Sequence, residues 1–417
     1  MKIHTLVLMG FISAPLTAAP SEQAVLNHYA DLAQVMYQDA LLQARELDLA
    51  VKALIAHPDE THLEATRAAW IKARHPYQQT EAYRFGNPIV DDWEGKVNAW
   101  PLDEGLIDYV ARSYGSDSDE NPYYTANIIA NPKLTHGNRV IDTSQLNKTT
   151  LSEQLHELGD VESNVATGYH AIEFLLWGQD LNGTGPGAGR RPASDYDTQH
   201  CSGGHCDRRA AYLNAVSELL IDDLEWMEKQ WRDDGAARLA VTQGDTQHNL
   251  ATIFTGLGSL SYGELAGERM KLGLLLHDPE EEHDCFSDNT HWSHYNDALG
   301  IHNVYTGRYM RIDGRVLSGP SLSNLVEDKS PEADHRLRMA MRDTLMQMNA
   351  LVESAEQGVA YDQLIGENNP EGNALVASAV EALVAQTRAI EKAVQAMGLE
   401  AITFEGSDSL DAPQKVR

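Results

Sequence analysis

The sequence predicts an all-α protein made of two related helical bundles. Apolar side chains recur every three or four residues along most of the 417-residue chain, which is the spacing of one helix face. The alternating pattern of half-buried strands is scarce. A motif in the first half has an echo in the second half, which indicates an internal duplication. A chain of this length also favours two domains over one compact core.

Residues 1–19 have the features of a secretory signal peptide. Lys2 precedes an apolar run over residues 6–16, and small residues follow at positions 17–19, where cleavage is expected. The cleavage region contains no cysteine, so a lipid anchor is not expected. No later run is long and apolar enough to span a membrane. We therefore expect an exported protein, in the periplasm or peripherally attached to the outer membrane.

The first helical bundle is expected at residues 20–180. An apolar stripe over residues 26–54 predicts one long helix, which Pro58 ends. Thr61 and Glu64 then have the spacing of a capping box, which predicts the start of the next helix.

Residues 181–206 are rich in Gly, Pro, Ser and Asp and are expected to form the loop between the bundles. Within this loop, Cys201 and Cys206 flank a flexible turn, and export would allow them to form a disulfide. The alternative is a metal cluster that also uses His200 and His205. Four ligands within seven residues are too crowded for an easy tetrahedron, so the disulfide is favoured.

The second helical bundle is expected at residues 207–400, followed by a polar tail at 401–417. A third cysteine, Cys285, has no obvious partner and is expected to be a free thiol. Gly398 is expected to end the last helix. The predicted helices of this bundle are Asp207–Trp231, Thr246–His277, Pro331–Glu356 and Asn373–Met397.

The internal echo joins two strings of equal spacing. Four residue types recur at the same offsets, and the glutamate of the first copy is a tyrosine in the second. If the duplication is real, only the first copy kept a carboxylate. The two strings are Asn164-x-Ala166-x-Gly168-x-His170-x-x-Glu173 and Asn296-x-Ala298-x-Gly300-x-His302-x-x-Tyr305.

His170 and Glu173 form the most informative pair in the chain. Residues three apart lie on the same helix face, and the residues around this pair are apolar nearly all round. The helix is therefore expected to be buried, and a buried carboxylate needs a metal ion, a cation or a hydrogen bond. One interpretation is that both side chains bind a metal. The other is a histidine and a glutamate hydrogen-bonded within a helical core.

The string Gly168-x-His170-x-x-Glu173 resembles the GxHxxE motif of the imelysin family, bacterial cell-envelope proteins that include the M75 peptidases and iron-regulated proteins. The resemblance implies duplicated helical bundles, metal binding and a role in iron uptake. It favours a divalent or trivalent metal, iron first, with zinc or calcium as alternatives. Three further segments look like landmarks of the family and extend the resemblance over residues 29–397: Trp70-x-x-x-Arg74-x-x-Tyr77-x-x-x-Glu81, Trp100-Pro-Leu-Asp103-Glu104-Gly-Leu-Ile-Asp108, and Phe286-Ser-Asp288-Asn289-Thr290-His291.

These segments supply further candidate ligands with oxygen or nitrogen donors. Each also has a structural explanation. Glu81 could pair with Arg74 or Arg84, and Asp103 could cap the helix that follows it. An Asx-turn and a packed histidine would explain the two candidates of the second half. The candidates are Glu81, Asp103 and Glu104, with Asp288 and His291 as residues that could line the same cleft from the second half.

The motifs of well-known metal enzymes are absent from the sequence. A zincin needs His-Glu-x-x-His, but the nearest string, at residues 156–160, ends in Asp160. The inverted motif fails because Phe174 follows Glu173. A ferritin-like site would need two Glu-x-x-His motifs on helices, and the second match, at residues 280–283, lies in an acidic loop. A mononuclear site is the most economical interpretation.

The chain is strongly acidic, with 32 basic and 62 acidic residues and a formal charge of −30. This charge argues against nucleic acid or an anionic membrane as a partner, and it suits the attraction of cations. Three functions follow as hypotheses. The first is an exported metal-binding protein associated with iron uptake. The second is a metal-dependent M75-type peptidase, and the third is a non-metal adaptor that binds a peptide or another envelope protein.

Overall fold

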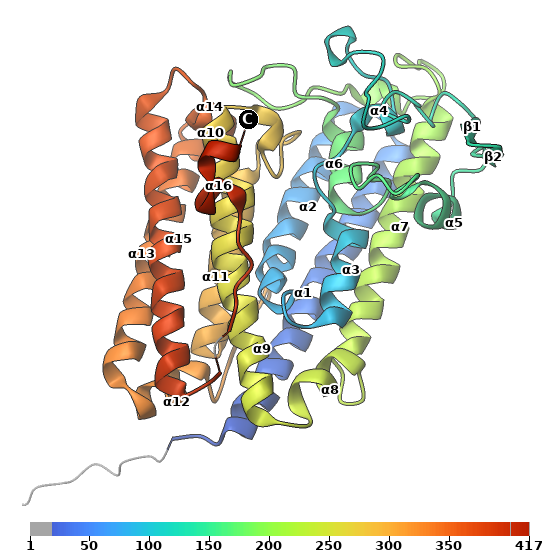
Figure 1. Ribbon diagram of the computed structural model, residues 1–417. Coiled ribbons are helices and arrows are strands. Elements are labelled where there is room, and N and C mark those ends of the chain that lie inside the picture. The colour runs from blue at the N-terminus through green and yellow to red at the C-terminus, as the bar shows by residue number, and fades with distance from the viewer. Residues whose placement is uncertain (1–18, 401, 417) are drawn as a thin grey trace, which may run out of the picture.

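The computed structural model describes residues 19–400 and 402–416, and within them helices are the dominant secondary structure (Figure 1). The prediction of an all-α fold is confirmed. The strands in this part of the chain form two short antiparallel hairpins, β1 (Lys133–His136) with β2 (Arg139–Asp142) and β3 (Arg308–Met310) with β4 (Val316–Ser318). The predicted signal peptide lies outside the described residues, apart from Ala19.

The helices follow one another with short connections, except around the two hairpins and in the long irregular segment at residues 178–205. Two stretches are wound as π-helix, Leu151–Leu155 and Leu260–Lys271, and the second joins α9 directly to α10. The helices are α1 (Glu22–Ala56), α2 (Glu60–Gln78), α3 (Pro88–Asn98), α4 (Glu104–Ile107), α5 (Lys148–Thr150), α6 (Gly168–Trp177), α7 (Cys206–Gln230), α8 (Ala236–Thr242), α9 (Thr246–Ser259), α10 (Leu272–Leu276), α11 (Thr290–Thr306), α12 (Leu322–Lys329), α13 (Pro331–Glu356), α14 (Tyr361–Ile365), α15 (Pro370–Met397) and α16 (Asp408–Asp411).

The helices form two groups that lie side by side (Figure 1). In the first group, α1 packs against α2 and α7, and α6 packs against α2, α3 and α7. In the second group, α13 packs against α11 and α15. Helix α11 also contacts α2, so it joins the two groups. Although α7 follows the predicted linker at residues 181–206, it packs with the first group.

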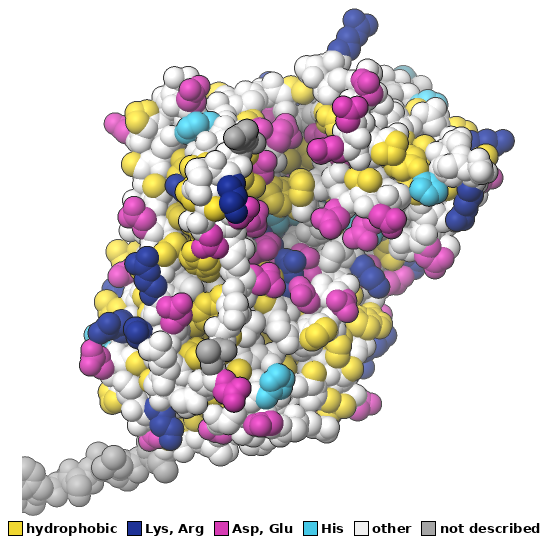
Figure 2. All heavy atoms as spheres, viewed as in Figure 1, with side chains coloured by type: hydrophobic (Ala, Val, Ile, Leu, Met, Phe, Trp, Pro, Cys, Tyr) yellow, Lys and Arg dark blue, Asp and Glu magenta, His cyan; other side chains and the backbone are white. Residues whose placement is uncertain are grey.

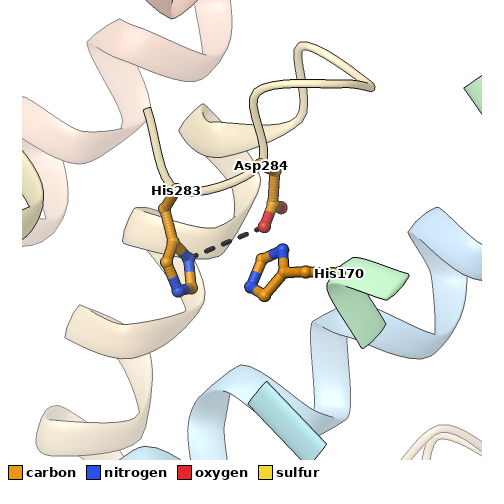
Figure 3. Close-up of side chains that lie close together, drawn as sticks. All are labelled: His170, His283 and Asp284. Carbon is orange, nitrogen blue, oxygen red and sulfur yellow. Dashed lines mark ion pairs between the residues drawn. The ribbon is translucent and has the colours of Figure 1, made fainter. Parts of the chain in front are cut away.

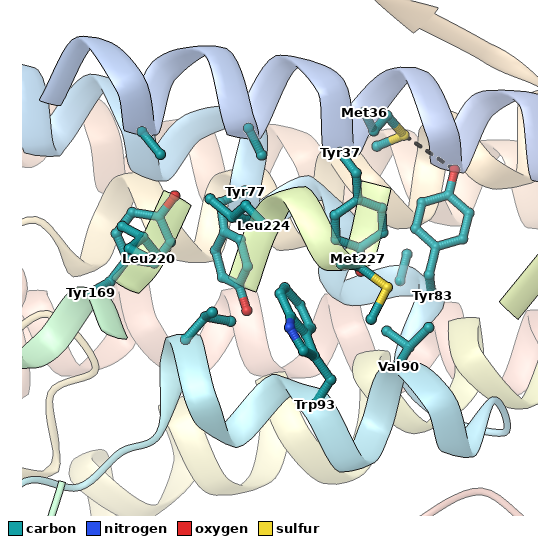
Figure 4. Close-up of a cluster of buried hydrophobic side chains, with 14 of the residues drawn as sticks. Met36, Tyr37, Tyr77, Tyr83, Val90, Trp93, Tyr169, Leu220, Leu224 and Met227 are labelled. Atoms are coloured by element: carbon teal, nitrogen blue, oxygen red, sulfur yellow. Dashed lines mark hydrogen bonds between the residues drawn. The ribbon is translucent and has the colours of Figure 1, made fainter. Parts of the chain in front are cut away.

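Aromatic side chains fill the centre of the first group (Figure 4). Tyr37 of α1, Tyr77 of α2 and Trp93 of α3 are each at most 3% exposed. The ring centroids of Tyr37 and Trp93 lie 5.9 Å apart, edge to face, an arrangement that the charge distribution of aromatic rings favours. The hydroxyl of Tyr83 donates to the sulfur of Met36 at 3.1 Å. This packing holds α1, α2 and α3 together beside the short helix α6.

The predicted helix boundaries are correct in several places and wrong in others. Helix α13 spans the predicted Pro331–Glu356, with Ser330 as its N-cap. Helix α15 ends at Gly398, which has a positive φ of 69°, although the helix begins three residues before the predicted start. The predicted capping box at Thr61 is wrong, because the cap is Asp59, whose carboxylate accepts from the backbone N–H of His62.

In the structure, Cys201 and Cys206 form a disulfide at the start of α7, and Cys285 is a free cysteine. Bridged sulfurs carry no thiolate, so the geometry does not support the alternative of a metal cluster with His200 and His205. Oxidation of the pair in the exported protein stays a prediction. No helix among residues 19–400 and 402–416 is long and apolar enough to cross a membrane.

The duplication also stays a prediction. Gly168 opens α6, whereas Gly300 lies in the interior of α11, so the two copies of the motif occupy different positions in their helices. Both glycines touch the backbone of a neighbouring segment. A Cβ on Gly168 would lie 2.4 Å from the carbonyl oxygen of Val97, and one on Gly300 would lie 2.4 Å from that of Gln79.

Candidate metal centre

The start of α6 is fixed by close backbone packing, and this places His170 and Glu173. Gly168 has a positive φ of 80° and lies against the end of α3, where only a glycine fits. The hydroxyl of Thr167 donates to the carbonyl oxygen of Lys96 at 2.9 Å. All residues of α6 are buried, as the apolar pattern predicted. The polar side chains of this helix must therefore find partners inside the protein.

His170 and Glu173 are partners of each other. Nδ1 of His170 lies 3.0 Å from Oε2 of Glu173, and the two side chains are 1% and 0% exposed. The other carboxylate oxygen, Oε1, accepts from the backbone N–H of Ser287 at 3.0 Å and from its hydroxyl at 2.7 Å. The interpretation as a hydrogen-bonded pair is therefore correct for Nδ1. Nε2 of His170, however, is buried and has no hydrogen-bond partner.

The loop before α11 brings two further potential ligands to His170. Possible ligand atoms of His170, His283 and Asp284 all lie within 4.8 Å of one another, and the three residues are buried. A guanidinium nitrogen of Arg74 lies 3.4 Å from Nδ1 of His283. Figure 3 shows the three side chains pointing toward one another, His170 from α6 and the other two from the loop. The rings of His170 and His283 are 4.8 Å apart, and Nδ1 of His283 lies 3.6 Å from Asp284.

The carboxylate of Asp284 is held in place by several donors. Arg74 of α2 donates to Oδ1 at 2.9 Å, and Asn289 donates to Oδ2 at 2.8 Å. The hydroxyl of Ser293 also donates to Oδ2. Burial opposes the charged form, but Arg74 and these hydrogen bonds outweigh it and lower the pKa of Asp284. The carboxylate is therefore ionised at neutral pH, with Arg74 as its ion-pair partner.

The histidines are in the neutral form that binds metals. Burial, reinforced by the charge of Arg74, lowers the pKa of His170 to about 3. Burial also lowers the pKa of His283 well below its usual value. Burial has the opposite effect on Glu173, whose pKa it raises together with the charge of Asp284. Burial therefore favours the protonated carboxyl of Glu173 beside a neutral imidazole at His170.

The donor set fits a first-row transition metal. Two imidazole nitrogens and one carboxylate oxygen form the set typical of non-haem iron sites, and zinc accepts the same ligands. Nε2 of His170 is buried without a hydrogen-bond partner, as expected for an atom whose partner is a bound metal ion. His294 stacks on His283 at 6.5 Å, and both of its ring nitrogens are also buried without a partner. His294 is therefore a further potential donor next to the set.

His283 and Asp284 are not among the candidate residues that the sequence indicated. Residues 278–284 look like an acidic surface loop in the sequence, because the stretch holds five acidic residues and no apolar run. In the structure, His283 and Asp284 are 1% and 0% exposed. The family-like segment at residues 286–291 was the available signal, since it lies two residues beyond this pair.

Glu81 does not lie in the metal centre, and the interpretation of an ion pair is correct, although with a different arginine. Its carboxylate accepts from Arg269 at 3.0 Å and from the hydroxyl of Tyr77 at 2.9 Å. The sequence suggested Arg74 and Arg84 as the partners of Glu81. Arg74 instead binds Asp284, and Arg84 pairs with Asp91 at 2.9 Å.

Asp103 and Glu104 are also absent from the metal centre, so the expectation that one of them or Glu81 joins His170 is not met. Asp103 occupies the N-cap position of α4, but its carboxylate accepts from Asn121 and Ser163, at 2.6 Å each. Glu104 is buried, and burial raises its pKa. Both residues follow the turn at Trp100, which itself contacts His283.

The two candidates from the second half of the sequence, Asp288 and His291, lie near the loop that carries His283 and Asp284. They are not part of the group around His170. Asp288 forms a separate acidic group with Glu282 and Asp362, whose carboxylate oxygens lie within 4.8 Å of one another. Burial, followed by the charges of Asp362 and Asp180, raises the pKa of Asp288 to about 8. His291 is half-buried, packs against Trp292, and has an Nδ1 without a partner. The packed histidine is therefore the better interpretation of this residue.

Comparison with known proteins gives consistent results. The sequence profile of the imelysin family (peptidase M75) matches residues 33–390. The chain is 24% identical over 370 residues to iron-regulated protein A of Synechococcus elongatus, covering 86% of this chain and 81% of that protein. A crystal structure described as an iron-regulated protein A precursor, from Parabacteroides distasonis, superposes with a TM-score of 0.65 at 19% identity, covering 92% of this chain and 98% of that one. An imelysin-like protein from Psychrobacter arcticum gives a TM-score of 0.60 at 16% identity, with 93% and 100% covered.

Proposed function

This chain is a member of the imelysin family, and from that premise we propose that it is an exported cell-envelope protein that binds a metal ion, with iron uptake as its context. The metal centre consists of His170, His283 and Asp284. Two relatives support this context, since one is named for iron regulation and another is described as a precursor of such a protein, a word that fits export.

One observation carries the proposal. Nε2 of His170 is buried without a partner, beside a second histidine and an ionised carboxylate from a different part of the chain. A buried polar atom that is left without a hydrogen bond costs about 1–3 kcal/mol, so such groups are seldom kept without a reason. A metal ion bound to Nε2, His283 and Asp284 supplies that reason.

Glu173 then acts through His170. A carboxylate that accepts from one ring nitrogen of a histidine fixes the ring and directs the other nitrogen to the metal. Oε1 of Glu173 is itself held by Ser287, which follows the ligand loop. The GxHxxE motif thus provides one ligand and the group that orients it, rather than two ligands.

The buried geometry favours a small ion over a polypeptide substrate. His170, Glu173, His283 and Asp284 are each at most 1% exposed, so a peptide chain does not reach them in this conformation. Glu173 is also engaged by Ser287 and is not free to act as a general base. These contacts support metal binding over the two alternatives, the M75-type peptidase and the non-metal adaptor.

Metal titration of the purified protein tests the proposal. We expect the chelator-treated chain to bind one Fe²⁺ or Zn²⁺ by calorimetry and elemental analysis, and we expect His170→Ala and His283→Ala to lose this binding. His302→Ala is the matched control, because His302 carries the same Gly-x-His pattern and lies outside the cluster. Equal binding by the parent and both cluster variants would refute the metal centre.

A further inference from the structure

A second group of potential ligands lies beside the metal centre and contains only carboxylates. Glu282 immediately precedes the ligand His283, Asp288 precedes α11, and Asp362 belongs to α14. One carboxylate oxygen from each lies within 4.8 Å of the others. Glu282 and Asp362 are each 1% exposed, and Asp288 is half-buried.

The carboxylates of this acidic triad (Glu282, Asp288 and Asp362) lack the partners that buried acids have elsewhere in the molecule. Asp39 pairs with Arg311 at 2.7 Å, and Asp297 pairs with Arg269 at 3.1 Å. Among residues 19–400 and 402–416, no Lys, Arg or His nitrogen lies within 4.0 Å of a triad carboxylate oxygen. Four of the six triad oxygens are buried and have no hydrogen-bond partner: Oε1 of Glu282, Oδ1 of Asp288, and Oδ1 and Oδ2 of Asp362.

Three carboxylates packed in this way require compensation. Removing a carboxylate from water costs several kcal/mol, and the mutual repulsion of like charges adds to this cost. At Asp39 and Asp297 the protein offsets the cost with an arginine. At the triad, the described side chains supply no positive charge, and the free oxygens converge on one another.

We propose that Glu282, Asp288 and Asp362 form a second cation site, distinct from the His170 centre, and that it takes a hard divalent cation of the Ca²⁺ type. Oxygen donors without nitrogen or sulfur are the ligands that Ca²⁺ prefers. Ca²⁺–O distances of about 2.3–2.6 Å allow ligand oxygens to lie up to about 5 Å apart, which suits the spacing of the triad.

The surroundings of the triad attract cations. Asp180 and Glu280 line a small cavity together with Glu282, and the charge of Asp180 also acts on Asp288 and Asp362 of the triad. Figure 2 shows acidic side chains gathered along the hollow between the two helix groups. Charges of one sign in a hollow raise the local concentration of the opposite ion. Part of the formal charge of −30 is thus concentrated beside this site.

The two sites share a loop but differ in chemistry. His283 and Asp284 turn toward His170, whereas the preceding residue, Glu282, faces Asp362 and Asp288. The first site offers imidazole nitrogens, which suit iron or zinc, and the second offers only oxygens. Loss of one site by mutation should therefore leave the cation specificity of the other unchanged.

Calorimetric titration of the chelator-treated full chain with CaCl₂ tests this proposal. We expect one Ca²⁺ per chain at pH 8, and an affinity at least tenfold weaker in both Glu282→Gln and Asp362→Asn. His170→Ala should bind Ca²⁺ as the parent does, which separates this site from the metal centre. Asp117→Asn with Glu162→Gln is the control for general attraction, since both residues are exposed acids that line another hollow.

A second variant tests the site at a position where a substitution is less disruptive to the fold. Asp288→Asn changes the half-buried member of the triad and should weaken Ca²⁺ binding while the helical circular dichroism stays that of the parent. The proposal is overturned if the parent binds no Ca²⁺, or if the folded triad variants bind it as tightly as the parent. It is also overturned if the exposed control variant loses as much affinity as they do.

Discussion

The proton on the His170–Glu173 pair links the buried site to solution chemistry. Burial raises the pKa of Glu173 and lowers that of His170, so it favours a protonated carboxyl beside a neutral imidazole in the free protein. Binding of a metal to Nε2 requires the proton of the imidazole to be on Nδ1, where it is donated to an ionised Glu173. The carboxyl proton must then leave the site.

We therefore predict that metal binding by the parent protein releases one proton. Zn²⁺ titrations at pH 7 in buffers of different ionisation enthalpy should show a dependence with a slope near one proton per ion. In Glu173→Gln the carboxyl proton does not exist, so the slope should fall to near zero. The same slope in the parent and in this variant would show that the pair does not take part.

We also predict that Glu173→Gln weakens metal binding without unfolding the protein. The amide keeps the shape of the side chain but orients His170 less strongly, and loss of such an orienting group costs about 10–100-fold in affinity. Competition with a zinc-binding dye measures the change. Ser287→Ala, which removes one of the two donors to Oε1, should have a smaller effect in the same direction.

At this scale, the sequence revealed half of the centre. His170 and Glu173 lie three residues apart on one helix, so a local pattern was sufficient to find them. His283 and Asp284 are brought to them from more than 100 residues away, and this proximity depends on how the loop before α11 folds. The same reason explains why the partner of Glu81 was wrong. Arg269 lies 188 positions further along the chain, and no local spacing indicates it.

At the scale of single elements, the π-helical stretch Leu260–Lys271 holds the two helix groups together through one side chain. Arg269 is 2% exposed and binds Glu81 of the first group and Asp297 of α11, at 3.0 Å and 3.1 Å. It also binds Glu264 at 2.7 Å. The periodicity predicted a continuous helix over Thr246–His277. It could not show the wider turn, because both helix types give a similar apolar pattern.

We predict that Arg269→Met destabilises the protein by about 3–5 kcal/mol, because it leaves the charges of Glu81 and Asp297 buried without a partner. Urea unfolding followed by circular dichroism measures the free energy. Arg315→Met is the control, since Arg315 and its partner Asp313 are 72% and 43% exposed, and it should change stability by less than about 0.5 kcal/mol. Similar losses in the two variants would contradict the role assigned to Arg269.

The start of α6 allows a second prediction at this scale. Gly168→Ala should cost more than Gly314→Ala, although the two glycines have nearly the same φ, 80° and 83°. Both variants lose about 1–2 kcal/mol of stability, because alanine is strained in the left-handed conformation. Only at Gly168 does the new methyl group meet backbone, 2.4 Å from the carbonyl oxygen of Val97, whereas nothing lies within 4 Å at Gly314.

The difference between the two glycine variants therefore measures the packing of α6 against α3. We expect it to be at least ~1 kcal/mol in urea unfolding. A shift of α6 should also displace His170, so Gly168→Ala should bind Zn²⁺ more weakly than Gly314→Ala. Equal stability and equal affinity in both variants would show that this contact does not position the site.

At the scale of the whole molecule, the sequence predicted the all-α class correctly, because helical periodicity persists along the chain. It did not predict that α7 belongs to the first helix group. The Gly-rich segment before α7 looks like a boundary between domains, yet α7 packs against α1 and α6. Composition marks where a chain is irregular, whereas packing is decided by the faces that meet. The proposed metal centre lies where the two helix groups meet, with His170 from one and the loop before α11 from the other.

A metal that joins the two groups should stabilise the whole protein. An ion that binds only the folded state adds about 2.7 kcal/mol when its concentration is 100 times the Kd. We predict that Zn²⁺ or Fe²⁺ at this excess raises the free energy of unfolding by about that amount in the parent and in His302→Ala, and by less than ~0.5 kcal/mol in His283→Ala. Each protein is compared with and without metal, so any packing loss in a variant cancels. Because ligands from both groups are needed, hydrogen exchange should slow in α6 and in the loop before α11 together. Slowing confined to one of them would show that the ion does not bridge the groups.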